Sequence, residues 1–102
     1  MAGTEVLTST LNEVATSVEE LTERYRQSVS RMYSVGGELD AMWEGPANRQ
    51  FMYQLGSDRV RFDAMAKLLQ SYYETLRNAA ATYVKAENEV QTVLNTNTMR
   101  RS

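Results

Sequence analysis

Apolar residues recur at alternating intervals of four and three along most of this chain, and this spacing limits the folds open to it. Side chains spaced in this way line one stripe of an α-helix, whereas a β-strand needs alternation at every second residue. The first run is Leu7, Leu11, Val14, Val18, Leu21, Tyr25, Ser28, Met32, Val35, Leu39 and Met42. The second is Phe51, Leu55, Asp58, Phe62, Met65, Leu69, Tyr72, Leu76, Ala79, Tyr83, Ala86, Val90 and Val93. The chain is therefore predicted to be all-α, with two long helices.

The break between the two runs falls at Gly45-Pro46. Proline favours the first position of a helix, and glycine tolerates the backbone geometry of a tight turn before it. The helices are predicted at about 6–42 and 46–92, and so short a connection makes them antiparallel neighbours. Residues 1–94 then form one helical hairpin, and residues 95–102, which lack the period, form a flexible C-terminal tail.

Two adjacent glycines, Gly36 and Gly37, interrupt the first run without shifting its phase. Each glycine costs a helix about 1 kcal/mol relative to alanine. Because the spacing continues across them, the sequence predicts close helix packing at this point rather than a break.

The apolar stripe is wider than one helix neighbour needs. Small or apolar residues also occupy the flanking positions, namely Thr8, Ala15, Thr22, Val29, Gly36 and Trp43 in the first helix and Met52, Ala66, Leu68, Tyr73 and Ala80 in the second. A face of three positions in seven suits a four-helix bundle, and a 102-residue hairpin buries little by itself. The sequence therefore predicts that the hairpin dimerises into a four-helix bundle.

Charge favours antiparallel packing of the two arms. Residues 1–45 carry eight acids against three arginines, a net charge of −5, and residues 46–102 carry eight bases against five acids, a net charge of +3. Exposed ion pairs contribute only about 0–1 kcal/mol each, so this asymmetry selects orientation and adds little stability.

Composition excludes several classes of function. The chain has no cysteine and no histidine, which removes disulfides, thiolate metal sites, and the commonest general base and metal ligand. Its acid pairs lack a third ligand type, so no metal or other cofactor is expected, and no nucleophile motif indicates an enzyme. The net charge of −2 with dispersed arginines argues against nucleic acid. The N-terminus resembles no cleavable signal peptide and no apolar run could span a membrane, so these features alone suggest a cytoplasmic protein.

The predicted turn carries the most specific motif in the chain. It contains the single tryptophan, in Trp43-Glu44-Gly45, followed by Ala47 and the aromatic Phe51. With the length and the two heptad-patterned helices, this motif closely resembles the WXG-hundred (ESAT-six-like) family over the whole chain. A second segment, Tyr83-Val84-Lys85-Ala86-Glu87, is similar to the tyrosine-x-x-x-acid pattern of that family.

The resemblance implies export by a type VII secretion system without a cleavable signal, from the cytoplasm to the outside of the cell. It implies that Trp43 and Gly45 form the turn and that Tyr83 and Glu87 belong to the export signal. It also implies that the turn of one subunit lies beside the tyrosine-acid segment of an antiparallel partner, and that this composite end is presented to a membrane-bound ATPase. The residue pattern alone leaves simpler interpretations open, because Tyr83 occupies a core position of the repeat and Trp43 could merely fix the bend.

Three functions follow from these observations. The first is a non-enzymatic secreted substrate or component of the secretion machinery, paired with a second copy or a related hairpin. The alternative is a targeting chaperone that forms a heterodimer with the helical N-terminal region of a larger effector. Direct membrane action ranks last, because the polar faces lack the lysine and arginine enrichment of interfacial helices.

Overall fold

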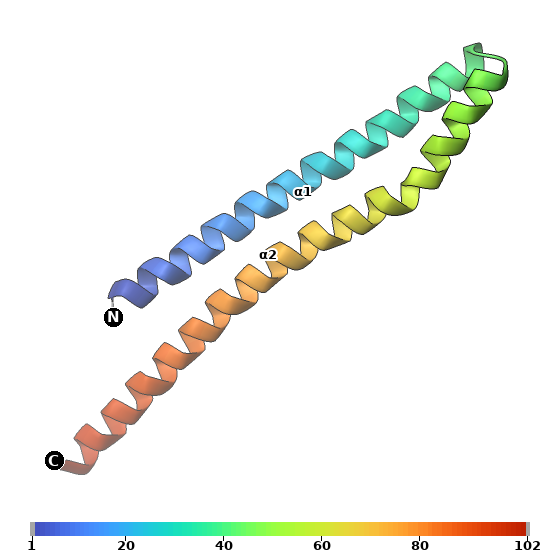
Figure 1. The fold of residues 1–102 in the computed structure, drawn as a ribbon. Helices are drawn as coiled ribbons and strands as arrows, with labels where there is room; N and C mark the ends of the chain where they lie inside the picture. Colours follow the sequence, from blue (N-terminus) through green and yellow to red (C-terminus); the bar gives the residue numbers. More distant parts are fainter. Residues whose placement is uncertain (1, 102) are drawn as a thin grey trace. The chain divides into compact units, whose positions relative to one another are not determined.

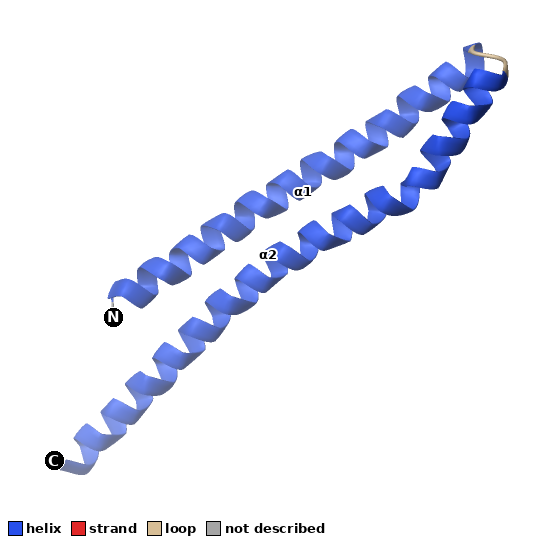
Figure 2. Cartoon of the chain, in the orientation of Figure 1, coloured by secondary structure: helices blue, strands red, loops and turns tan. Residues whose placement is uncertain are grey.

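A computed structural model of the chain contains two helices, α1 (Ala2–Met42) and α2 (Pro46–Arg101), joined by a three-residue turn (Figures 1 and 2). The structure describes residues 2–101, and it describes the side chains of residues 3–96. Within the described range there is no β-strand. The predicted all-α helix-turn-helix hairpin is thereby confirmed.

The helix ends at the turn agree with the sequence prediction, and the two outer ends do not. Helix α1 ends at Met42 and α2 begins at Pro46, as predicted. However, α1 already begins at Ala2, and α2 continues to Arg101, past the predicted end at about residue 92. No glycine or proline follows Gly56, so nothing in the local sequence stops the helix where its apolar spacing ends. The flexibility predicted for residues 95–102 remains a prediction, and Ser102 lies outside the described residues.

The chain divides into two compact units. The turn unit is Val18–Ser71, and the terminal unit combines Met1–Ser17 with Tyr72–Ser102. Each unit contains a stretch of α1 lying antiparallel to a stretch of α2 (Figure 1).

Helix α1 of the turn unit approaches α2 closely at a glycine. Gly36 is buried, and a methyl group at its Cβ position would lie 2.9 Å from Cδ2 of Leu55. Gly37 has nothing within 4 Å of the same position. The close packing predicted at this glycine pair is therefore confirmed, and Gly36 alone accounts for it.

Two tyrosines of α1 tie the turn unit together through backbone carbonyls of α2. The Tyr33 hydroxyl donates a hydrogen bond of 2.6 Å to the carbonyl of Leu55, and the Tyr25 hydroxyl donates one of 3.2 Å to that of Phe62. The Tyr33 ring meets the Phe62 ring edge to face at 6.2 Å, and the Arg59 guanidinium lies 4.8 Å from the centre of the Tyr33 ring. Desolvation raises the pKa of Tyr33 above its usual value, outweighing the opposing effect of Arg59.

The terminal unit packs through smaller and more polar groups. Ala15 and Ala80 are buried, whereas the Thr8 hydroxyl is buried without a hydrogen-bond partner. Beside it lies a hollow of about 340 Å³ lined by residues that include Thr4, Thr8 and Glu87. Alanines and hydroxyls contribute little apolar area, so burial stabilises this part of the hairpin weakly.

The predicted apolar run proves to serve two different faces of the turn unit. Leu55, buried, and Tyr25 and Phe62, half-buried, lie between the helices together with flanking small residues such as Thr22 and Ala66. Val18 and Leu69 are also half-buried, whereas seven other apolar members are between 37% and 77% exposed in the single chain. We call this second set, with its neighbour Leu68, the outward stripe: Leu21, Met32, Val35, Leu39, Met42, Phe51, Met65 and Leu68.

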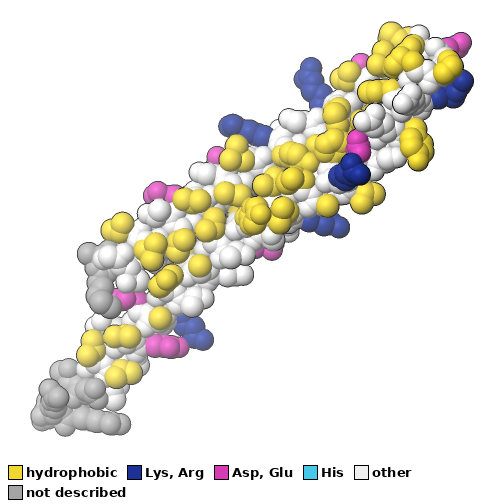
Figure 3. Space-filling view, viewed as in Figure 1, with side chains coloured by type: hydrophobic (Ala, Val, Ile, Leu, Met, Phe, Trp, Pro, Cys, Tyr) yellow, Lys and Arg dark blue, Asp and Glu magenta, His cyan; other side chains and the backbone are white. Residues whose placement is uncertain are grey.

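The members of the outward stripe from α1 and α2 lie on the same side of the turn unit. In both helices they stand one position before an inward residue, as Val35 does before Gly36 in α1 and Met65 before Ala66 in α2. Two antiparallel helices that face each other through equivalent positions are related by an approximate twofold axis perpendicular to the plane that contains them. Residues at the same offset from the facing positions therefore point to the same side of that plane. Figure 3 shows hydrophobic side chains gathered along one face of this unit. The terminal unit likewise exposes Leu7, Val14 and Tyr72 of the predicted runs.

Candidate functional site

The turn owes its shape to Gly45. Its φ of +119° lies where side-chain-bearing residues are rarely found, so glycine is required there. The Gly45 carbonyl accepts a hydrogen bond of 3.2 Å from the amide of Arg49, which makes Gly45 the residue that caps α2. Pro46, the first residue of α2, has no amide hydrogen to leave unpaired.

Side chains fix the turn from two directions. The half-buried Trp43 ring lies 6.0 Å from the Phe51 ring at an angle of 44°, joining the end of α1 to the first turns of α2. The Asn48 side-chain amide donates a hydrogen bond of 2.7 Å to the carboxylate of Asp40. Asn48 is only 7% exposed and Asp40 is exposed, so this bond is shielded from water on the asparagine side. The turn is therefore a rigid feature, held by an aromatic pair and a charge-assisted hydrogen bond.

The structure brings together Trp43, Gly45 and Phe51, which the sequence singled out, and adds two residues that it did not. Asp40 and Asn48 lie eight positions apart across the turn, and neither belongs to an apolar run. Their only sequence signal is an acid in the last turn of one helix and an asparagine in the first turn of the next. Such a pair becomes informative only once the turn conformation is known.

A family model described as "WXG100: Proteins of 100 residues with WXG" matches residues 4–88 of the chain. The chain belongs to the WXG100 family. The match includes both helical arms, the Trp43-Glu44-Gly45 turn and the Tyr83–Glu87 segment. No individual curated protein and no solved structure shows significant similarity to the chain.

WXG100 proteins are small proteins associated with type VII secretion, and they typically pair with one another. For the WXG100 hairpin described here, membership accounts for the tryptophan and glycine at the bend. The resemblance that the sequence indicated is thereby confirmed.

The Tyr83–Glu87 segment lies on α2 in the terminal unit of this WXG100 protein. Tyr83 is 45% exposed, so its ring is not part of the core of the single chain. Glu87, one helical turn later, is half-buried and lines the hollow beside Thr4 and Thr8. Lys85 and Glu89 form an exposed ion pair at 4.0 Å, a separation at which such pairs contribute little. An exposed aromatic ring and a nearby carboxylate together offer a partner an apolar contact and a negative charge.

The described residues contain no group of three or more carboxylates that could hold a metal ion. In the same part of the chain, neither helix includes a stretch that is apolar enough over sufficient length to cross a bilayer.

Proposed function

We propose that this WXG100 protein is a non-enzymatic hairpin exported by a type VII secretion system, acting as a secreted substrate or co-secreted component and pairing with a second copy of itself. The turn around Trp43 and Gly45 and the segment around Tyr83 and Glu87 would carry the export signal. The secretion ATPase would be the partner that recognises it. Family membership is the observation that carries this proposal.

The exposure of Tyr83 supports its assignment to the signal. A partner can bury the exposed part of an aromatic side chain that is 45% exposed. Tyrosine gives such a contact a large area at low entropic cost. The rigidity of the turn supports the assignment of Trp43, because a preformed surface binds without an ordering cost.

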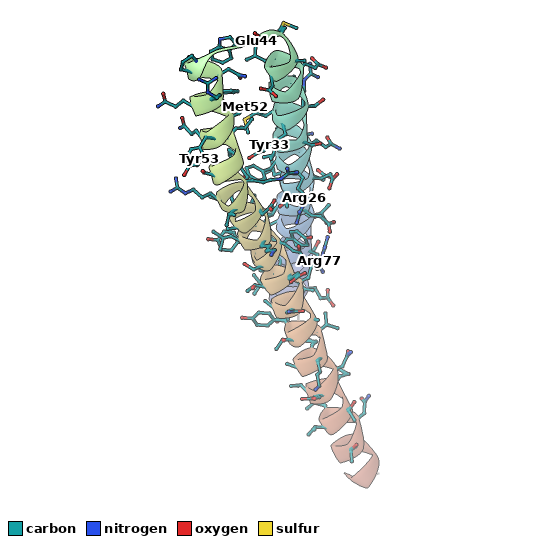
Figure 4. The ribbon with its side chains drawn as sticks, turned by 90° about the vertical axis from the view of Figure 1, so that its right-hand side faces the viewer. Arg26, Tyr33, Glu44, Met52, Tyr53 and Arg77 are labelled. Atoms are coloured by element: carbon teal, nitrogen blue, oxygen red, sulfur yellow. The ribbon has the colours of Figure 1, made fainter. Side chains whose placement is uncertain are left out.

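Export of single-residue variants tests the signal. Tyr83→Ala should leave the protein folded and abolish its appearance in the medium. Tyr53→Ala is the matched control, because Tyr53 is 78% exposed on α2 and points away from α1 (Figure 4). Trp43→Ala should likewise abolish export, and Trp43→Phe shows whether lost packing against Phe51 is the cause. Normal export of Tyr83→Ala and Trp43→Ala would contradict the signal assignment.

The thin core of the single chain supports pairing. Only Ala15, Leu55, Ala66 and Ala80 are buried hydrophobic residues among the described side chains, and none of the large side chains is fully buried. Fully burying a leucine, methionine or phenylalanine side chain contributes about 1.5–3 kcal/mol. The outward stripe offers seven such partly exposed groups and Val35 on one side of the turn unit, which a second hairpin could cover.

A pair of identical substitutions tests pairing through the outward stripe. Val35→Glu places a charge within the stripe, and Val60→Glu places the same charge on the outer face of α2, where Val60 is 74% exposed. In sedimentation at micromolar concentration the natural protein and Val60→Glu should be dimers, and Val35→Glu should be a monomer. A folded monomer of the natural protein would exclude the homodimer, and a hairpin that becomes ordered only with a co-expressed effector would favour the chaperone role.

A further inference from the structure

We infer that the thioethers of Met32 and Met65 form a modification site for two-electron oxidants such as peroxides, and that their conversion to sulfoxides prevents self-association through the outward stripe. This inference rests on the pairing proposed above.

Met32 on α1 and Met65 on α2 lie at nearly the same height along the helix axes of the turn unit. Tyr33 contacts Phe62, and the Arg26 guanidinium donates a hydrogen bond of 3.3 Å to the Gln70 side chain. These two contacts fix the register of α1 against α2, and both Met32 and Met65 fall between them along their own helices. Because both also belong to the outward stripe, their sulfur atoms lie on the same face, in the middle of its apolar surface.

Exposure separates these methionines from another in the same unit. Met32 is 38% exposed and Met65 is 46% exposed in the single chain. Met52, by contrast, is half-buried and points toward α1 (Figure 4). Oxidation of methionine follows access of the oxidant to sulfur. Met32 and Met65 should therefore react before Met52, as should Met42, the third methionine of the stripe, which is 77% exposed at the end of α1.

The chain leaves an oxidant few competing targets. It contains no cysteine, so thioethers are its most readily oxidised side chains toward peroxide. In the reaction the sulfur attacks one peroxide oxygen, the O–O bond breaks and an S–O bond forms. The sulfur is oxidised by two electrons, and hydrogen peroxide is reduced to water.

A sulfoxide changes the chemistry of the stripe. Methionine is a flexible apolar side chain that fills gaps at an interface, whereas its sulfoxide is polar and carries a strong hydrogen-bond acceptor. The neighbours of these residues in the stripe, such as Val35 and Leu68, offer no side-chain donor. Burying a sulfoxide against them leaves the acceptor unpaired, which weakens association about tenfold for each modified residue.

The experiment treats the full chain with hydrogen peroxide. The protein concentration is low enough that monomers are present. Modified residues are identified by peptide mass spectrometry, and self-association is measured by sedimentation before and after treatment. The natural protein should acquire sulfoxides at Met32 and Met65 before Met52. Its dissociation constant should rise about ten-thousandfold when both residues are modified in both subunits, because the dimer then buries four sulfoxides. Treatment with methionine sulfoxide reductases should restore the original value.

Two double variants serve as matched tests. Met32→Leu with Met65→Leu should pair as the natural protein does. It should keep pairing after peroxide, because Met42, the third methionine of the stripe, is the last residue of α1 and 77% exposed, so its sulfoxide stays in contact with water. Met42→Leu with Met52→Leu, which keeps the thioethers of Met32 and Met65, should lose pairing after peroxide like the natural protein. Equal loss of pairing in both variants, or unchanged pairing of natural protein carrying both sulfoxides, would overturn the inference. A protein that is monomeric before any peroxide is added would instead refute the proposed pairing.

Discussion

The two adjacent glycines of α1 offer a direct test of how tightly the hairpin is packed. Alanine at Gly37 meets nothing within 4 Å, so only the helix-propensity gain of about 1 kcal/mol applies. Alanine at Gly36 brings the same gain, but its methyl group would lie 2.9 Å from Cδ2 of Leu55. Overpacking a core costs about 1–3 kcal/mol, and here the displaced atom ends a side chain that is itself 8% exposed.

We therefore expect Gly37→Ala to stabilise the protein by about 1 kcal/mol, which raises the melting temperature by roughly 4–8 °C in a domain of this size. Gly36→Ala should be neutral or destabilising by up to about 1 kcal/mol, because the steric cost at the lower end of its range cancels or exceeds the propensity gain. The difference between the two variants is then about 1–2 kcal/mol.

Thermal and urea unfolding followed by circular dichroism measure this difference. Protein concentration must be equal in all samples, because pairing adds to apparent stability. A second pair, Gly36→Val and Gly37→Val, enlarges the contrast, since both valines have the same intrinsic helix propensity and only the first meets Leu55. Equal stabilisation by Gly36→Ala and Gly37→Ala would refute the close helix approach at this level.

Three further outcomes are expected. Gly45→Ala should destabilise by about 1–3 kcal/mol in thermal unfolding because its φ is +119°, whereas Gly56→Ala, in helical geometry with open space around it, should stabilise by about 1 kcal/mol. A double-mutant cycle of Asp40→Ala and Asn48→Ala should give a coupling free energy of about 1–2 kcal/mol in urea unfolding, and additive effects would show that their hydrogen bond is not formed in solution. Since the pKa of Tyr33 is raised in the folded protein, its contribution to stability is present below the usual tyrosine pKa of 10.0 and is lost as the pH rises through the folded value, so Tyr33→Phe should lessen the alkaline loss measured by unfolding at pH 9 to 11.

Most of the candidate site could be predicted from the sequence, because it depends on residues with unusual local properties. The single tryptophan, the glycine and the proline mark the turn by themselves, and the structure places α1 and α2 on either side of it as expected. Asp40 and Asn48 could not be predicted, since an acid and an amide at helix ends are ordinary until the turn brings them within 2.7 Å. The outer helix ends were also missed, because apolar spacing reports where a stripe is buried and not where backbone hydrogen bonding stops.

The sequence by itself determined that this chain forms two helices and where it reverses, since a period of three and four fits only a helical stripe and glycine-proline interrupts it. Only the tertiary structure decided how the stripe is divided between two faces. Buried small residues such as Ala15, Thr22 and Gly36 let the helices approach each other, and the larger members such as Leu21, Val35 and Met65 then turn outward. A pattern of three apolar positions in seven is compatible with either division, and the space available between the two backbones selects one.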